Sequence, residues 1–277
     1  MTADVDHAPA HPPASQAARR RWSRFRATLA VLATQLAILV ALLAFWEQAT
    51  SSNKAFAFMF GSPSAIGGFL VQMVRDGSLW RDTSITGLET LLGFFVGNFI
   101  GTLIGLSLWY SRFVSRVVEP FVIALGSIPI IALAPIIIIW FGTGLVSKVA
   151  MSTLSVVIVA LVTSYKGAVG VDPDQINLMR TLGASKFQVF RMLVVPASLT
   201  DIFAGLKLTV GFALIGAIVG EFMSSSDGLG HAIFKAGSLY VIPKVFAALV
   251  VTIALALFLT FLVGKIERLL MPWRRRL

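Results

Sequence analysis

Cysteine is absent from the chain, so disulfide bonds and thiol chemistry contribute nothing to its fold or function. Histidine is almost as rare, and two of the three histidines, His7 and His11, lie close to the N-terminus. The sequence therefore predicts no metal site and no histidine-activated nucleophile. A phosphate-binding loop is also missing, because the nearest stretch, GTGLVSKV, has the wrong spacing between glycine and lysine. Neither a membrane hydrolase nor an ATPase site is expected on this chain.

Charged side chains are few for a protein of this length. Only 13% of the 277 residues are charged, whereas 57% are hydrophobic and the mean hydropathy is +0.85. One soluble core cannot bury so much apolar surface, so lipid is the expected solvent. The net charge of +10 does not indicate nucleic-acid binding, because aromatic residues fall inside apolar runs and membrane proteins collect Lys and Arg in cytoplasmic loops.

Long apolar runs predict an all-α membrane protein with six transmembrane helices. Seventeen of the 23 Lys and Arg residues fall in segments on the same side as the N-terminus, so both termini are expected in the cytoplasm. The predicted spans cover about residues 29–46, 84–110, 117–141, 148–165, 202–223 and 245–263.

Residues 1–18 are rich in Ala, Pro and His, and an arginine cluster follows over residues 19–26. Residues 1–28 therefore predict a disordered basic cytoplasmic tail before a transmembrane domain over 29–277. A cleaved signal peptide is the alternative for the first apolar run, but it has no clear cleavage site and more apolar runs follow. Residues 47–83 are then external. Apolar residues at helical spacing, such as Ile66 and Met73, predict an amphipathic helix there, at the outer membrane interface.

Glycines recur at every fourth position in two predicted spans, which places them on one helix face. Such a ridge lets a neighbouring helix approach closely in lipid. The ridges comprise Gly93, Gly97, Gly101 and Gly105 in the second span, and Gly216 and Gly220 in the fifth.

Four acidic residues lie within or beside predicted spans, and two of them, Glu119 and Asp201, lie at cytoplasmic ends, where hydration lowers their cost. The other two are Glu89 in the second span and Glu221 in the fifth. Intramembrane carboxylates are costly and mark candidate functional sites. Each of them either lines a solute path or bonds to a neighbouring helix, and the sequence leaves both possibilities open. A set this small does not favour a proton relay.

The loop between the fourth and fifth spans, about residues 166–200, carries two helix-start signals. Asp172 followed by Pro173 predicts the first helix, and Ser185 with Gln188 predicts the second. The loop is too polar to span the membrane and too regular to be a flexible linker. It therefore predicts a pair of short amphipathic helices.

Glycine and proline punctuate this loop. Gly183 suits the turn after the first helix, which is expected to run through Leu182, and Pro196 is expected to end the unit. The pair either packs on its own bundle or docks a cytoplasmic partner through an apolar face. The predicted apolar faces comprise Ile176, Met179 and Leu182 on the first helix, and Phe187, Phe190 and Val194 on the second.

The stretch NLMRTLGASKFQVFRMLVVP, residues 177–196, resembles the EAA loop of ABC importer permeases. That loop has Glu-Ala-Ala, three residues, Gly, nine residues, an aliphatic residue, two residues and Pro. Gly183, Leu193 and Pro196 fit this spacing, whereas Asn-Leu-Met replaces Glu-Ala-Ala at residues 177–179. Two further blocks, SIPIIALAPIIIIWFGTG and IFAGLKLTVGFALIGAIVGEF, the second followed by GLGHAI, resemble the nitrate, sulfonate and taurine group of these permeases.

The resemblance implies a type I ABC importer permease fold, and a homodimer in the bacterial inner membrane. It also implies two cytoplasmic ATPase subunits, which bind ATP and Mg²⁺, and an external solute-binding protein, with no cofactor on this chain. A small anionic or heteroaromatic solute (nitrate, a sulfonate, taurine, an aromatic carboxylate or a thiamine precursor) is then imported by alternating access. The ATPase-coupling residues that it implies are Asn177, Leu178, Met179, Leu182, Gly183, Ala184, Phe187, Phe190 and Pro196.

Polarity and position mark Phe94, Asn98, Trp140 and Glu221 as candidates to line the solute path. A secondary transporter or channel that works alone is the alternative function. Inverted repeats or several paired membrane charges would favour it, and neither is evident in the sequence.

Overall fold

The computed structural model describes residues 14–270, with side chains from residue 28 onward, and every regular element in this range is a helix. The contacts divide the chain into two compact units, Met1–Ser64 and Ala65–Leu277. Part of the predicted tail, residues 1–13, lies outside the described residues. From Ala14 onward the chain is already helical, so the first helix begins earlier than its apolar run indicates.

The first unit holds α1 (Ala14–Ser52) and α2 (Lys54–Phe60). Asn53 separates the two helices and caps α2, because its side-chain oxygen accepts two backbone N–H groups of the first turn (2.9 and 3.2 Å). The apolar part of α1, Thr28–Ser52, contains the first predicted span, and within the chain it is almost wholly exposed. Such a surface is stable only against lipid or another protein chain.

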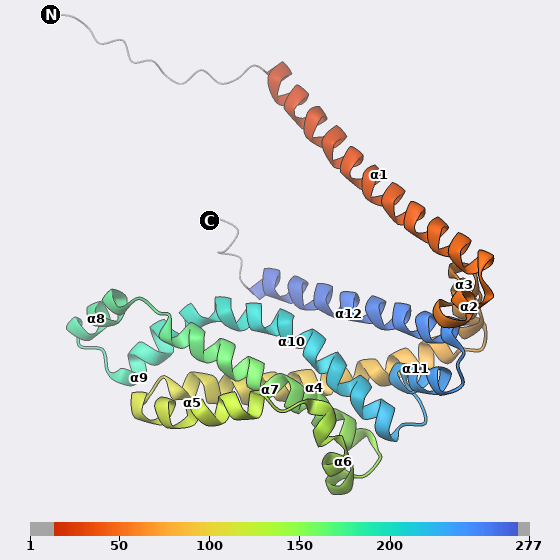
Figure 1. The fold of residues 1–277 in the computed structure, drawn as a ribbon. Helices are drawn as coiled ribbons and strands as arrows, with labels where there is room; N and C mark the ends of the chain where they lie inside the picture. The colour runs from red at the N-terminus through yellow and green to blue at the C-terminus, as the bar shows by residue number, and fades with distance from the viewer. Residues whose placement is uncertain (1–13, 271–277) are drawn as a thin grey trace, which may run out of the picture. The chain divides into compact units, whose positions relative to one another are not determined.

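The second unit is a bundle of long helices joined by short turns. Figure 1 shows α4, α7, α10 and α12 side by side, with α8 and α9 at one end of this bundle and α11 at the other. The helices that follow α2 are α3 (Pro63–Arg75), α4 (Ser78–Leu108), α5 (Arg112–Gly126), α6 (Ile130–Phe141), α7 (Leu145–Val169), α8 (Pro173–Thr181), α9 (Lys186–Val189), a π-helical turn (Phe190–Val194), α10 (Val195–Ser224), α11 (Leu229–Ser238) and α12 (Ile242–Leu270).

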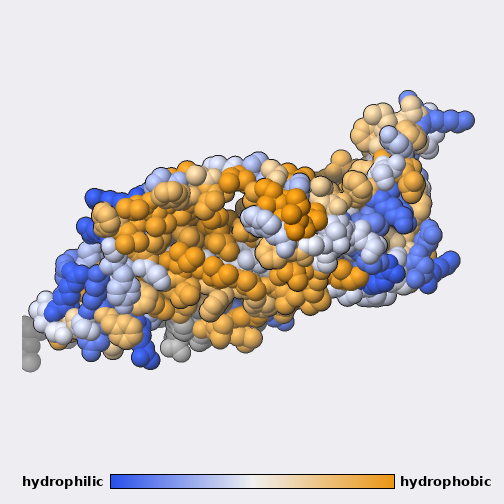
Figure 2. All heavy atoms as spheres, turned by 90° about the horizontal axis from the view of Figure 1, so that it is seen from below, coloured by the Kyte–Doolittle hydropathy of each residue, from blue (hydrophilic) through white to orange (hydrophobic). Residues whose placement is uncertain are grey.

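Four of the predicted spans correspond to single long helices, namely α4, α7, α10 and α12. The amphipathic helix expected in the external segment is α3, which buries Ile66 and Met73 and exposes Val74. Large apolar side chains cover much of the bundle surface, and Figure 2 shows hydrophilic side chains gathered towards its ends. This distribution is typical of a protein that crosses a lipid bilayer.

The glycine ridges hold α7 between α4 and α10. A Cβ atom added at Gly97 of α4 would lie 2.7 Å from Val156 Cβ of α7. On the opposite side, a Cβ atom at Gly216 of α10 would lie 2.6 Å from the Cα of Ser152. Since real Cβ atoms do not approach so closely, only glycine permits this spacing, and the close packing predicted from the sequence is confirmed.

The span predicted over residues 117–141 is broken. Its two halves, α5 and α6, meet at an angle of 93°. Pro129 stands at the bend, where it lacks an N–H group and disfavours helical geometry at Ile128. Hydropathy reports how apolar a segment is but not its direction, so the sequence did not reveal the bend. Among the described residues, five helices are long and apolar enough to span, and two bent pairs raise the possible number to seven.

Pro196 does not end the helical unit, contrary to the prediction. The chain stays helical from Lys186 to Ser224, through α9, the π-helical turn and α10. Proline cannot donate a backbone hydrogen bond, and its ring crowds the carbonyl one turn earlier. The wider π-helical turn directly before Pro196 removes this conflict, so the loop and α10 form one continuous helix.

We expect Gly97→Ala to lower the stability of the bundle, because the new methyl group has no room beside Val156 and Thr153. Overpacking of this kind costs about 1–3 kcal/mol. The readout is the thermal unfolding midpoint of the purified protein in detergent. Gly87→Ala on the same helix is the matched control, because the nearest atom to its new Cβ lies 3.9 Å away. Equal midpoints for the two variants would contradict this packing.

Candidate functional site

The loop between α7 and α10 begins with α8. Asp172 caps this helix by accepting a hydrogen bond from the backbone N–H of Asp174 (2.9 Å), and Pro173 occupies its first turn. Gly183 ends the helix with a φ of +81°, a left-handed conformation that favours glycine. The N–H of the next residue then bonds back to Met179 O (3.0 Å), which satisfies one of the last carbonyls of the helix.

The second loop helix, α9, starts with the predicted capping box. Ser185 Oγ accepts from the Gln188 N–H (3.3 Å), while Gln188 Oε1 accepts from the Ser185 N–H (2.7 Å). Both ends of the Gly183 turn are therefore fixed by hydrogen bonds. The loop therefore contains the two short helices that the sequence predicted, and hydrogen bonds hold the turn between them.

One side of the loop packs on the bundle. Val189 and Val194 are buried against the end of α7, and Ile176, Met179 and Phe190 pack around them. Phe190 also stacks on the aromatic pair at the end of α4, with its ring centroid 5.6 Å from that of Trp109 and 4.8 Å from that of Tyr110. Ala184 contacts the same cluster. The loop therefore has a hydrophobic core in common with the bundle.

The other side of the loop presents apolar side chains. We call Leu178, Leu182 and Phe187 the loop patch; their exposed fractions are 61%, 76% and 60%. The predicted faces were partly wrong, because Leu182 and Phe187 were expected beside the residues that pack inwards. Asn177 is exposed and lines a polar cavity, and Pro196 is exposed at the start of α10.

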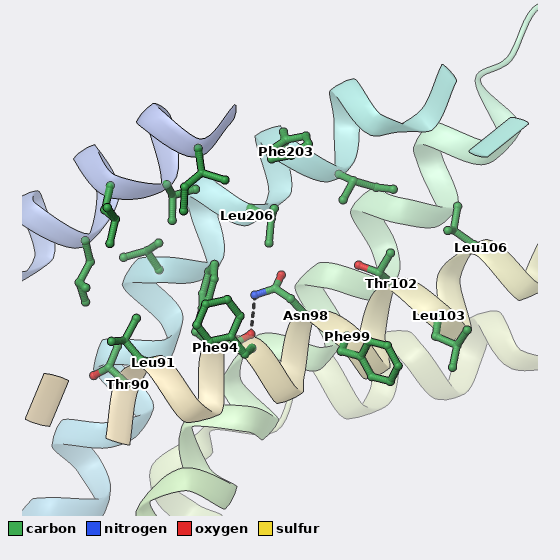
Figure 3. Close-up of a pocket in the computed structure, with 17 residues that line it drawn as sticks. Thr90, Leu91, Phe94, Asn98, Phe99, Thr102, Leu103, Leu106, Phe203 and Leu206 are labelled. Atoms are coloured by element: carbon green, nitrogen blue, oxygen red, sulfur yellow. Dashed lines mark hydrogen bonds between the residues drawn. The ribbon is translucent and has the colours of Figure 1, made fainter. Parts of the chain in front are cut away.

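An apolar pocket of about 450 Å³ lies between α4, α10 and α12. Figure 3 shows Phe94, Asn98 and Phe99 on α4, with Phe203 and Leu206 of α10 on the other side. Two of the four candidate path residues, Phe94 and Asn98, line this pocket. Their role in a solute path stays a prediction.

Asn98 is the main polar group in the pocket wall. Its amide nitrogen donates to Phe94 O (2.8 Å), and its amide oxygen accepts from Thr209 Oγ1 (3.1 Å). These two bonds hold the side chain in one orientation, and the second N–H of the amide stays available as a donor. Nearby, Thr90 has a buried hydroxyl with no hydrogen-bond partner among the described residues. None of the described residues that line this pocket is a lysine or an arginine.

The other two candidate path residues lie away from this pocket. Trp140 is on α6 and is 72% exposed. Glu221 of α10 is fully buried; its Oε1 accepts from Thr86 Oγ1 of α4 (2.6 Å), and its Oε2 accepts from the N–H of Gly230. Glu221 is thus bonded to a neighbouring helix, and its role in a solute path, like that of Trp140, stays a prediction.

Glu221 is the centre of what we call the outer cluster, which fastens the turn before α11 to α4. Thr86 Oγ1 accepts from the Leu229 N–H (2.9 Å), and Asp82 accepts from the Gly228 N–H (3.3 Å). Arg81 pairs with Asp227 at the rim. Gly228 has a φ of +105°, and a Cβ there would overlap the Glu221 carboxylate, so glycine is required at this approach.

Two further ionisable side chains are buried next to this cluster. Glu89 of α4 is only 3% exposed, and its Oε2 has no hydrogen-bond partner among the described residues. Lys148 donates to the carbonyl oxygens of Thr143 (2.5 Å) and Ser224 (3.1 Å) and so ties the start of α7 to the end of α10. The sequence analysis did not identify Thr86 or Lys148 as members of this site. The only local signal was the Gly-Leu-Gly stretch at residues 228–230, which is typical of a turn.

The helical bundle with its two-helix loop has the fold of an ABC importer permease. The permease chain of the inward-facing MetNI methionine ABC transporter superposes with a TM-score of 0.63 at 22% identity, over 70% of this chain and 96% of that one. The chain belongs to the family described as binding-protein-dependent transport system inner membrane component, whose model matches residues 97–272. It is a multi-pass protein of the bacterial inner membrane.

Relatives in this family carry names with different solutes. The riboflavin transport system permease protein RibX of Chloroflexus aurantiacus is 36% identical, over 85% of this chain and 88% of that protein. The formylaminopyrimidine transport permease protein ThiX of Halalkalibacterium halodurans is 36% identical, over 57% and 64%. The putative aliphatic sulfonates transport permease protein SsuC of Bacillus subtilis is 27% identical, over 84% of each chain.

Family membership decides between the functions that the sequence left open. These relatives are permease subunits of ABC transporters and are not enzymes themselves. A membrane enzyme and a transporter that works alone are therefore set aside. The solute is not decided by the relatives.

We expect Thr86→Val to destabilise the outer cluster, because it removes the hydrogen bond to Glu221 Oε1 and the acceptor of the Leu229 N–H. Unsatisfied buried groups cost about 1–3 kcal/mol each. The midpoint of thermal unfolding should fall, and the peptide bonds around residue 227 should become easier to cleave with a protease.

Thr83→Val is the matched control for this change. Thr83 lies on the same helix, and its buried hydroxyl has no hydrogen-bond partner among the described residues, so its loss should be neutral. If Thr86→Val were as stable and as protease-resistant as Thr83→Val, the outer cluster would not hold the turn.

Proposed function

We propose that two copies of this chain form the membrane channel of an ATP-driven importer, with α8 and α9 on the cytoplasmic side. Support for this orientation comes from the cations at the α8 end of the bundle, which exceed those at the α11 end, as the positive-inside rule requires. Two ATPase subunits bind the loops, and they carry ATP and Mg²⁺. An external solute-binding protein delivers the solute at the α11 end.

The loop patch is the surface that we assign to the ATPase. Leu178, Leu182 and Phe187 are exposed on helices whose opposite side is packed on the bundle, so the patch is held rigidly. A groove that covers such side chains gains about 1.5–3 kcal/mol for each one that becomes fully buried. A rigid apolar patch on a cytoplasmic loop therefore suits a subunit that must both bind and move the permease.

The continuous helix from Lys186 to Ser224 supplies the lever for alternating access. At about 1.5 Å per residue, its 39 residues reach about 58 Å, which exceeds the thickness of a bilayer core. Its inner end carries Phe187, and its outer end carries Glu221, which holds the turn before α11. ATPase closure that displaces α9 thus moves the outer cluster as well.

We expect Leu182→Asp and Phe187→Asp each to reduce the amount of ATPase subunit that co-purifies with the permease about tenfold or more, because a carboxylate cannot enter an apolar groove without a partner. The measurement is the ratio of ATPase to permease after affinity purification through a tag on the permease.

Leu239→Asp is the matched control for the docking variants. Leu239 is 65% exposed at the end of α11, at the opposite end of the bundle, so this change should leave the ratio unaltered. Full retention of the ATPase by both loop variants would contradict the assignment of the patch.

For the solute, we propose a flat heteroaromatic compound rather than a small anion. The observation that carries this choice is the apolar pocket, which places aromatic rings such as Phe94, Phe99 and Phe203 around one oriented amide, Asn98. A volume of about 450 Å³ suits a drug-sized molecule, and a pocket without a cation among its described lining residues offers an anion no counter-charge. The names of RibX and ThiX, which mention riboflavin and formylaminopyrimidine, support the same class.

We expect Phe203→Ala and Asn98→Leu each to raise the KM for riboflavin uptake about tenfold. The first removes a stacking surface, and the second removes the one side-chain amide among the described residues that line the pocket. Uptake is measured with the complete importer in membrane vesicles, and taurine serves as the anionic-solute comparison. Phe113→Ala, at a 77% exposed position on α5 outside the pocket, should have no effect. Taurine uptake with no riboflavin uptake would overturn the proposed solute class.

A further inference from the structure

A second cavity, of about 680 Å³, opens at the α8 end of the bundle. The ends of α4 and α7, the start of α5 and the loop helices α8 and α9 all contribute to its wall. We call it the basic cavity, because four of its lining residues are cations and only one is an acid: Arg112, Arg116, Arg180, Lys186 and Glu119.

The cations of the basic cavity form no ion pair with a carboxylate of the described residues. The guanidinium groups of Arg112, Arg116 and Arg180 form no hydrogen bond and no ion pair with any described residue. Lys186 is held in place, because its Nζ donates to Tyr110 O (2.6 Å) and lies 5.6 Å from the centre of the Tyr110 ring. Neither contact neutralises its charge. The cavity therefore presents at least three unpaired positive charges.

Asn177 explains part of this imbalance. It lines the cavity from α8, at the position where the EAA loop has glutamate. A carboxylate there would stand among the four cations and supply an internal counter-ion, whereas a neutral amide adds hydrogen-bonding groups and no charge. The departure from Glu-Ala-Ala thus leaves the cavity positive.

We propose that the basic cavity binds a phosphate group, presented either by the headgroup of an anionic lipid or by a soluble phosphate. Guanidinium groups form paired hydrogen bonds with phosphate oxygens, and Arg116 and Arg180 approach the cavity from different helices. The bound group would bridge α5 and α8 and so brace the loop against the bundle. Basic pockets between membrane helices on the cytoplasmic side are suited to anionic lipid headgroups.

The surface next to the cavity suits a lipid in particular. Phe113 and Phe121 of α5 are 77% and 65% exposed, on the helix that also carries Arg112 and Arg116. Trp109 and Tyr165 line the cavity, and such aromatic residues are typical of the membrane–water interface. A lipid could therefore place its headgroup in the cavity while its acyl chains lie along α5.

The test uses the purified full-length chain in detergent and requires no transport, so it is independent of the proposed function. The thermal unfolding midpoint is followed during titration with dioctanoyl phosphatidylglycerol, dioctanoyl phosphatidylcholine or inorganic phosphate. We expect a saturable rise with phosphatidylglycerol that weakens with added salt. Asn177→Glu, and the double variant Arg116→Gln with Arg180→Gln, should each weaken the apparent affinity at least tenfold.

Arg191→Gln is the matched control, because Arg191 is an exposed cation of the π-helical turn that does not line the cavity. Saturation by phosphatidylglycerol alone identifies a lipid site, and equal saturation by inorganic phosphate identifies a soluble phosphate; both support the proposal. It is overturned if neither ligand gives a saturable shift, or if the cavity variants match Arg191→Gln.

Discussion

Close contact between helix backbones along α7 is the constraint on which the rest of this structure depends. In lipid, apolar side chains gain little from leaving the acyl chains to contact one another, so helices associate through close packing and interhelical hydrogen bonds. Ser152 shows both effects, because it lies against Gly93 of α4 and Gly216 of α10, and its hydroxyl donates to Ala213 O (2.9 Å). The result is a three-helix unit, α4–α7–α10, whose members cannot slide without clashing.

This unit joins the two ends of the permease. At the α8 end, both loop helices pack on α7, α9 continues through the π-helical turn into α10, and the loop patch stays exposed. At the α11 end, Glu221 and Thr86 hold the turn before α11. The long helix from Lys186 to Ser224 therefore connects the loop directly to this turn.

Much of this arrangement could be predicted from local sequence signals. The glycines at every fourth position from Gly93 to Gly105 identified the face of α4 that contacts α7. The capping residues identified both loop helices. The bend at Pro129 could not be predicted, because the hydropathy of a segment does not report the direction of its helix axis. The π-helical turn before Pro196 could not be predicted either, because a proline can end a helix, kink it or be accommodated within it. The role of Glu221 also required the fold, since its partners lie on another helix and beyond a turn.

The central claim is that α4 and α7 stay fixed to each other during transport. The Thr102 and Ser164 hydroxyl oxygens lie 3.2 Å apart across this contact, and the chain has no cysteine of its own. A disulfide between Thr102→Cys and Ser164→Cys would therefore link the two helices and nothing else. ATP-driven uptake by the oxidised importer is the decisive measurement. We predict uptake close to that of the reduced protein. Loss of uptake on oxidation, restored by a reductant, would show that α4 and α7 must move apart.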